Sequence, residues 1–281
     1  MEELYSDVSF RISELITRTY STSFSIAVSY LSTEKKKAIH SIYGFVRVAD
    51  EIVDSFHRYD KQLLLEKFEM DYYDALETNI SLNPVLHSFQ QVVRKYNIPD
   101  ELVSAFLKSM KADLEEINYS HRDQINEYVF GSAEVVGLMC LKVFVDGDDQ
   151  LFEELRSPAM KLGSAFQKVN FLRDLKNDKE VLERNYFPEI HRTNFDEETK
   201  KEIVRDIRKD FSDSREGIKR LPGDARLPVT VAYFYFRRLL GKISRTPAQK
   251  LLAGRIRVPG IVKIFLLIKA YVVCKLNLMR N

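Results

Sequence analysis

Apolar side chains recur at spacings of three and four residues along most of this chain, which is the periodicity of an amphipathic α-helix. Turn-forming residues such as SLNP and DGDD stand between the periodic stretches. No stretch shows the strict alternation of a half-buried strand. The sequence therefore predicts an all-α fold, with helices over 37–56, 61–76, 85–96, 101–117, 124–145, 150–175, 197–220, 228–243 and 258–279.

No linker divides the chain. Its 281 residues include only 10 Gly and 8 Pro, and no Gly/Ser-rich or Pro-rich segment separates two halves. Length alone allows one large domain or two small ones, so the lack of a linker favours a single domain over residues 1–281. With 45% hydrophobic residues, such a domain has a core large enough to hold a long pocket.

Charge and cysteine content restrict the partners and the compartment. The formal net charge of +2 gives no general case for a nucleic-acid partner. Cys140 and Cys274 are the only cysteines, and their apolar neighbours favour reduced thiols over a disulfide framework. The N-terminal stretch MEELYSDVSFRISELI lacks the apolar core of an export signal, so we expect a cytoplasmic protein.

The C-terminal stretch 258–279 is the most apolar part of the chain. Lys263, Lys269 and Lys275 interrupt it, and a charge near a bilayer centre costs roughly 2.5–3.5 kcal/mol. We therefore expect no transmembrane span here. A last core helix is the simpler interpretation, and an interfacial helix with snorkelling lysines, peripheral on the inner face of a membrane, is the alternative.

The stretch SIYGFVRVADEIVDSF combines an apolar helical stripe with a column of polar side chains. Glu51 points nearly opposite the stripe and should be solvated. Two carboxylates four residues apart repel each other on a helix, more so when partly buried, and a bound cation removes that cost. An isolated pair of this kind is more often simply solvated. The column beside the stripe consists of Tyr43, Arg47, Asp50 and Asp54.

A second polar column lies on the more apolar helix FQKVNFLRDLKND. A buried ionised carboxylate must be paired or must coordinate a metal, so pairing with arginines such as Arg47 or Arg173 is one explanation. Two such columns in one helical domain favour a site between facing helices that holds Mg²⁺ against an anionic ligand. The members of this second column are Gln167, Asn170, Asp174 and Asp178.

At these residues the chain resembles the squalene/phytoene synthases. RVADEIVD (47–54) is similar to the first aspartate-rich motif of that family, and LGSAFQKVNFLRDLKND (162–178) matches the second throughout. The resemblance spans nearly the whole chain in the right order. Four further segments share it: STSF (21–24), YVFGSAEVVGLM (128–139), RNYFP (184–188) and GIKRLPGDARLPV (217–229).

The resemblance implies the isoprenoid (terpenoid) synthase helical fold, in which the two acidic helices face each other across a deep central cavity. It implies that two prenyl diphosphates are joined head to head through a cyclopropylcarbinyl diphosphate. Mg²⁺ would be the cofactor, with Mn²⁺ as a substitute. The implied metal ligands are Asp50, Asp54, Asn170, Asp174 and Asp178.

The resemblance also assigns substrate contacts. Arg47 and Arg173 would contact diphosphate oxygens, Gln167 would order that site, and Tyr128 would stand at the edge of the reaction centre. A departing diphosphate needs charge neutralisation but no protein nucleophile, and the carbocation that remains needs a dry, apolar pocket. Aromatic faces for that cation are expected from Phe24, Tyr43 and Phe166, whereas Phe45 is better explained as core. The donor end would be lined by Ser21, Ser23 and Phe24.

Other positions are weaker candidates or departures from the family pattern. Arg226 and the arginines at 255 and 257 would reach a second diphosphate, or lie on a solvated face. Tyr233 is better explained as core than as cavity lining. Glu134 stands where many relatives have glycine, so its carboxylate must turn toward a neighbouring helix to avoid the cavity.

The late segment looks more like phytoene synthase than squalene synthase. We therefore expect two geranylgeranyl diphosphates (C20) to be condensed through prephytoene diphosphate to phytoene, without NADPH. Squalene or dehydrosqualene synthesis from farnesyl diphosphate (C15) is the alternative, and a non-catalytic helical assembly factor is an alternative of another class. Substrates this apolar suggest loading from a membrane and contact with upstream and downstream isoprenoid enzymes.

Overall fold

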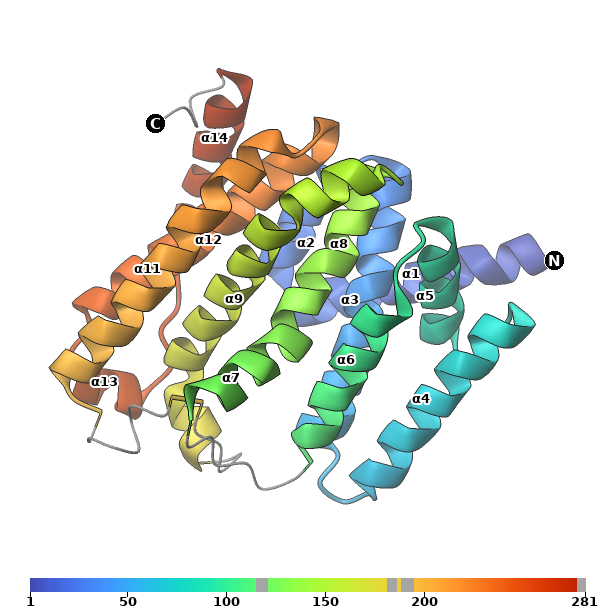
Figure 1. Ribbon diagram of the computed structural model, residues 1–281, viewed down its shortest axis with the longest axis horizontal. Helices are drawn as coiled ribbons and strands as arrows, with labels where there is room; N and C mark the ends of the chain where they lie inside the picture. The colour runs from blue at the N-terminus through green and yellow to red at the C-terminus, as the bar shows by residue number, and fades with distance from the viewer. Residues whose placement is uncertain (115–120, 181–185, 188–194, 277–281) are drawn as a thin grey trace.

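The structure is a computed structural model that describes residues 1–114, 121–180, 186–187 and 195–276, with the backbone alone for 177–180. Helices make up the fold, and no strand occurs within those ranges. The helices pack side by side as a bundle (Figure 1). Their bounds are α1 Glu2–Tyr20, α2 Thr22–Val28, α3 Thr33–Ser55, α4 Lys61–Thr78, α5 Pro84–Lys95, α6 Asp100–Ala112, α7 Arg122–Val129, α8 Val135–Val145, α9 Asp149–Glu180, α11 Glu197–Arg220, α12 Arg226–Arg245, α13 Ala248–Ala253 and α14 Gly260–Lys275.

The all-α prediction is confirmed, and each of the nine helices expected from periodicity has a counterpart in the structure. Three helices were not expected: α1, α2 and α13. The stretch 124–145 also holds a turn of π-helix, Phe130–Glu134, between α7 and α8. The expected end of the helix at 101–117 falls partly outside the described residues.

Helix α1 escaped prediction because its buried face is polar. Ser9, Ser13 and Thr17 are fully buried at the centre of that face, so its apolar signal comes only from the partly buried side chains beside them. The Ser13 hydroxyl lies 2.8 Å from that of Ser88 on α5. On the α3 side a Cβ at Gly44 would come 3.0 Å from the Ser13 Oγ, so small side chains let α1 pack closely against α3.

The stretch Arg122–Val145, which runs through α7, the π-turn and α8, is a core element. It is the one helix in the described ranges that is long and apolar enough to cross a membrane, and 56% of its apolar window is buried inside the fold. Leu138, Met139 and Val143 are fully buried against α3, α6 and α9. Burial by neighbouring helices explains its apolar character.

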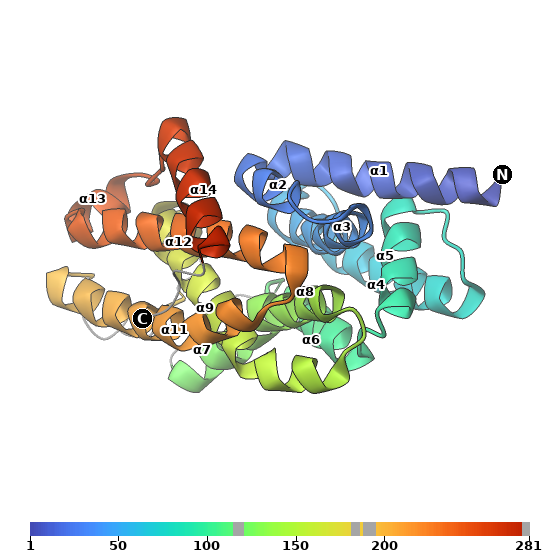
Figure 2. The ribbon, with the colours of Figure 1, turned by 90° about the horizontal axis from the view of Figure 1, so that it is seen from above.

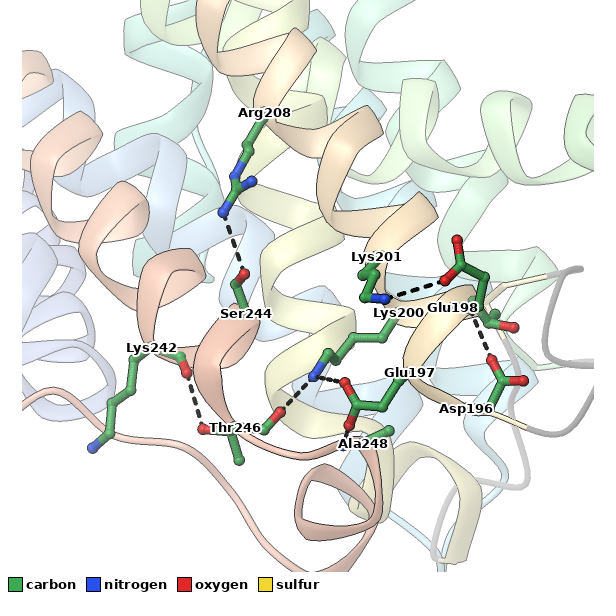
Figure 3. Close-up of polar contacts among 11 residues, drawn as sticks. Asp196, Glu197, Glu198, Lys200, Lys201, Arg208, Lys242, Ser244, Thr246 and Ala248 are labelled. Carbon is green, nitrogen blue, oxygen red and sulfur yellow. Dashed lines mark hydrogen bonds and ion pairs between the residues drawn. The ribbon is translucent and has the colours of Figure 1, made fainter.

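Polar contacts fix the start of α11 to the junction between α12 and α13 (Figure 3). Lys200 is almost fully buried, and its ammonium donates to the Thr246 carbonyl at 2.7 Å. The Glu197 carboxylate pairs with Lys200 at 2.6 Å and accepts from the Ala248 amide at 2.6 Å. These bonds anchor α13, from which the chain continues at once to Arg255.

Helix α14 is not the core helix that we expected. Only Leu266 and Ala270 are buried within it, on the side that packs against α12. The expectation failed because α14 lies at the edge of the bundle, beside α2 and above α12 (Figure 2), where no further helix in the described ranges covers its outer side.

Candidate active site

One cavity of about 680 Å³ runs between two hydrophobic clusters of the bundle. One cluster is built on α3, α5, α6 and α8, and the other on α9, α11 and α12. Side chains from Leu155 to Asp174 of α9 line the cavity. At 1.5 Å per residue this is roughly 28 Å of helix. The cavity is therefore long enough for an extended apolar chain.

Helix α3 contributes the first acidic column to the cavity. Asp50 and Asp54 line it, as do Arg47 and Tyr43. The Arg47 guanidinium lies 3.9 Å from the Asp50 carboxylate and 4.3 Å from the centre of the Tyr20 ring. A cation is thus placed directly beside the first carboxylate of the motif.

The expectation that Glu51 is solvated was wrong. Its side chain is only 23% exposed and forms an ion pair with Arg47. Burial acts to raise the pKa of Glu51, but hydrogen bonds with Arg47, Ser55 and Tyr20, together with the charge of Arg47, outweigh it, so the pKa is lowered. The position of Glu51 opposite the apolar stripe suggested exposure to solvent. In the structure, α1, which ends at Tyr20, covers this side of α3.

Helix α9 contributes the second column. Gln167, Asn170 and Asp174 all line the cavity, together with Arg173. The Arg173 Nε donates to the Asp174 carboxylate at 3.1 Å. The carboxylate also pairs with Arg255, so the arginine pairing considered above does occur for Asp174. The side chain of Asp178 lies outside the described residues.

The residues of both columns suit a hard divalent cation such as Mg²⁺. Carboxylate and amide oxygens are its usual protein ligands, with phosphate oxygens and water completing the shell. The Asn170 Oδ1 is buried and has no hydrogen-bond partner among the described residues, as expected for an oxygen that awaits a ligand. Over those same residues, no three Asp, Glu, His or Cys side chains gather closely enough to hold a metal by themselves.

Helix α2 lies over the same region of the cavity. Ser21 caps its N-terminus, where the hydroxyl accepts from the Phe24 amide at 3.4 Å. Ser21, Ser23 and Phe24 all line the cavity. The Phe24 ring stacks on Tyr43 of α3 with centroids 5.1 Å apart. Burial raises the pKa of Tyr43, so its hydroxyl stays protonated and available as a donor.

Tyr128 also lines the cavity, on the side of α7. Its hydroxyl donates to the Asp113 carboxylate at 2.8 Å, and its ring stacks on Tyr186 at 5.3 Å. Burial, and then the Asp113 charge, raise the pKa of Tyr128 well above its usual value. Asp113 has no distinctive spacing in the sequence, and only the packing of α6 against the π-turn at Phe130–Glu134 brings it to Tyr128.

Most of the rest of the cavity wall is apolar and partly aromatic. Phe166 stacks on Phe236 of α12 with centroids 4.1 Å apart. Gly217 lets α11 approach α9 closely beside the cavity, because a Cβ there would come 2.3 Å from the Cβ of Pro158. A polar end and an apolar length therefore meet in a single cavity.

Several residues considered earlier do not line the cavity, and the exposed Arg257 is one of them. Phe45 is fully buried between aromatic rings, with Phe89 stacked at 4.0 Å. Tyr233 is buried in the core, as expected. Arg226 is half-buried at the start of α12, outside the cavity lining.

Glu134 also lies outside the cavity lining. Burial raises its pKa to about 7, and its charged neighbours are Lys161, Asp210 and Lys168. These charged neighbours lie on α9 and α11, which are joined by the ion pair between Lys168 and Asp210 at 2.7 Å. Glu134 thus turns toward neighbouring helices, the only arrangement that we expected to spare the cavity.

Comparisons with known proteins agree with this geometry. A phytoene synthase of Arthrospira platensis is 26% identical over 262 residues, which cover 84% of each chain. The chloroplastic phytoene synthase 2 of Oryza sativa subsp. japonica is 26% identical over 270 residues, 85% of this chain and 64% of that one.

Solved structures share the fold. A dehydrosqualene synthase crystallised with a ligand superposes with a TM-score of 0.83 at 23% identity, over 96% of this chain and 98% of that one. Squalene synthase HpnC from Alicyclobacillus acidocaldarius gives a TM-score of 0.75 at 18% identity, over 90% and 97% of the two chains. Residues 17–261 match the model of one protein family, squalene/phytoene synthase. That match covers most of the chain, and the protein therefore belongs to the squalene/phytoene synthase family of prenyl-transferring enzymes.

Proposed function

We propose that this protein condenses two geranylgeranyl diphosphates head to head, through prephytoene diphosphate, to phytoene. The observation that carries the proposal is a cavity that brings both acidic columns together and is otherwise lined mainly by apolar side chains. The curated relatives named as phytoene synthases support the C20 substrate.

At the diphosphate end, residues of the two columns would bind the metal and the diphosphate oxygens. When bound, Mg²⁺ would neutralise diphosphate charge and make it a better leaving group. Asp50, Asp54, Asn170 and Asp174 would hold the metal, together with Asp178. Arg47 and Arg173 would bind diphosphate oxygens, because guanidinium groups donate to phosphate in a fixed fork.

The apolar wall would protect the cation that forms when the diphosphate departs. Phe166 and Phe236 line the cavity with their rings stacked on each other, and these rings and the aliphatic side chains around them would stabilise the cation and exclude water. Tyr128 is held in place by Asp113 and would border the reacting carbons. Proton loss from the final cation would then leave the hydrocarbon product.

Condensation of two farnesyl diphosphates is the second candidate, and the dehydrosqualene synthase fold with its TM-score of 0.83 favours it. The test is incubation of the purified protein with Mg²⁺ and either the C15 or the C20 diphosphate, followed by analysis of the extracted hydrocarbon. We expect a C40 product from the C20 substrate. Turnover of C15 alone would replace the phytoene assignment, and turnover of neither would remove the enzymatic proposal.

A further inference from the structure

Helix α14 carries large exposed apolar side chains along its outer side. Seven large hydrophobic side chains of this segment are exposed, among them Ile261 at 78%, Phe265 at 65% and Ile264 at 61%. Single exposed hydrophobics are normal on a protein surface, but a contiguous patch of this kind marks a contact site. The full set is Ile261, Ile264, Phe265, Ile268, Tyr271, Val272 and Leu276. We call it the α14 stripe.

The C-terminal part of the chain, which includes α14, carries basic residues and no acidic ones. No Asp or Glu follows Asp224, so all 41 acidic residues precede residue 225. The last 57 residues carry twelve Lys and Arg. Lys269 and Lys275 are exposed on α14 itself. The surroundings of the α14 stripe therefore favour an anionic partner over a neutral one.

The cavity reaches this part of the surface. Lys263 and Leu266 of α14 line it, and so does Ile26 of α2, which is 45% exposed. Helices α2 and α14 meet over α12 through Ala27, Ala270 and Val231, and Figure 2 shows the two helices side by side. The α14 stripe thus stands next to an edge of the cavity.

We propose that the α14 stripe lies in the interfacial layer of an anionic lipid bilayer and sets the cavity edge between α2 and α14 against the acyl region. An apolar helix face with flanking lysines is the pattern of a helix lying in the membrane plane. The lysines bind lipid headgroups while the apolar side chains enter the acyl boundary. The inference rests on the proposed function in one respect, because it gives an apolar diphosphate a route from the bilayer.

The test is flotation of the full-length protein with vesicles of phosphatidylcholine alone or of an equimolar mixture with phosphatidylglycerol. We expect binding to the anionic vesicles, weakened by high salt because exposed charges are then screened. Ile264→Ser, Phe265→Ser and Ile268→Ser together should lower the partition by at least about tenfold. Each of Lys269→Gln and Lys275→Gln should lower it by about fivefold.

The matched control replaces three exposed hydrophobic residues that are distant from α14 in the sequence, by Leu63→Ser, Met70→Ser and Leu82→Ser. It should bind anionic vesicles like the parent protein. No flotation of the parent, or equal flotation of both triple variants, would overturn the inference. Sedimentation showing that the α14 triple variant converts a dimer to a monomer, without any vesicle binding by the parent, would assign the stripe to a second copy instead.

The outcome is separable from that of the proposed function. None of the substituted side chains lines the cavity, so turnover of detergent-dispersed substrate should be unchanged in the α14 triple variant. Vesicle binding without turnover of either substrate would remove the proposed function and leave this inference. Turnover without vesicle binding would support the proposed function and remove this inference.

Discussion

The guanidinium Nε of Arg255 lies 2.8 Å from the Oδ1 of Asp174. The two residues are 81 positions apart in the chain. The contact depends on α13 being held against α11, since α13 leads directly to the loop that carries Arg255. An arginine outside both acidic motifs therefore fixes the orientation of a central carboxylate at the polar end of the cavity.

Arg255→Gln should lower turnover and raise the Mg²⁺ concentration needed for half-maximal activity. Removing a group that orients a metal ligand typically costs 10–100-fold in metal affinity or activity. The measurement is a Mg²⁺ titration of product formation at saturating substrate. Arg257→Gln is the matched control, because Arg257 is exposed and does not line the cavity. Equal Mg²⁺ dependence in the two variants would show that the ion pair has no part in the site.

Asp50→Asn and Asp174→Asn should each reduce turnover by about a hundredfold or more, because each removes charge needed to hold metal against diphosphate. The helical circular dichroism signal should not change. Glu34→Gln on the same helix as Asp50 is the control, since Glu34 is exposed and pairs with Lys95. Near-parent activity in one of the two Asp variants would remove the metal role from that column.

Ala159→Phe should shift the substrate preference toward the shorter diphosphate. Ala159 lines the cavity fifteen residues before Asp174, which is roughly 22 Å along α9 at 1.5 Å per residue. A ring placed there takes up space that only a longer chain needs. The ratio of C20 to C15 turnover should fall more than about tenfold, given that each buried methylene contributes about 0.8 kcal/mol.

The control for cavity depth is Met70→Phe, which adds a ring at an exposed site on α4. It should leave the ratio of C20 to C15 turnover as it is in the parent protein. If Ala159→Phe slows both substrates equally, the ring perturbs the reaction centre and the cavity end lies elsewhere.

The fold was predictable where the signal is local. An apolar stripe of period 3.6 is set by which side of a helix is buried, so α3 and α9 could be identified from their own residues. Helix α1 could not, because Ser9, Ser13 and Thr17 fill its buried side. The sequence could propose which side chains share a column, since helical geometry alone decides that.

Contacts between distant segments were beyond the sequence. Glu51 was expected to be solvated because the helical pattern of α3 contains no information on other helices. Tyr20 of α1 packs on Arg47, the ion-pair partner of Glu51. Arg255 was only a weak candidate, because nothing near it in sequence points to Asp174. The outer side of α14 was misjudged for the same reason, since burial depends on neighbours that periodicity does not reveal.

Glu134 stands at the end of the π-turn and is half-buried. Burial raises its pKa to about 7, above the ordinary value of 4.5, while Lys161 and Lys168 act in the opposite direction and Asp210 adds to the rise. The folded state therefore holds the proton more tightly than the unfolded state does. The free energy of unfolding consequently falls as the pH rises from about 4.5 through about 7 and then levels off.

Glu134→Gln should remove this loss, because a neutral amide needs no proton to stay buried. The stability of the variant relative to the parent should rise by about 2 kcal/mol between about pH 5 and about pH 8, allowing for solvent screening. Urea unfolding at a series of pH values measures it. Glu127→Gln, at an exposed site on α7, should show a difference that is flat over the same pH range, because Lys108 lowers the pKa of Glu127 below 4.5 and the group stays ionised there. A difference for Glu134→Gln that is equally flat would mean that the carboxyl is ionised throughout, paired with Lys161 in the folded protein.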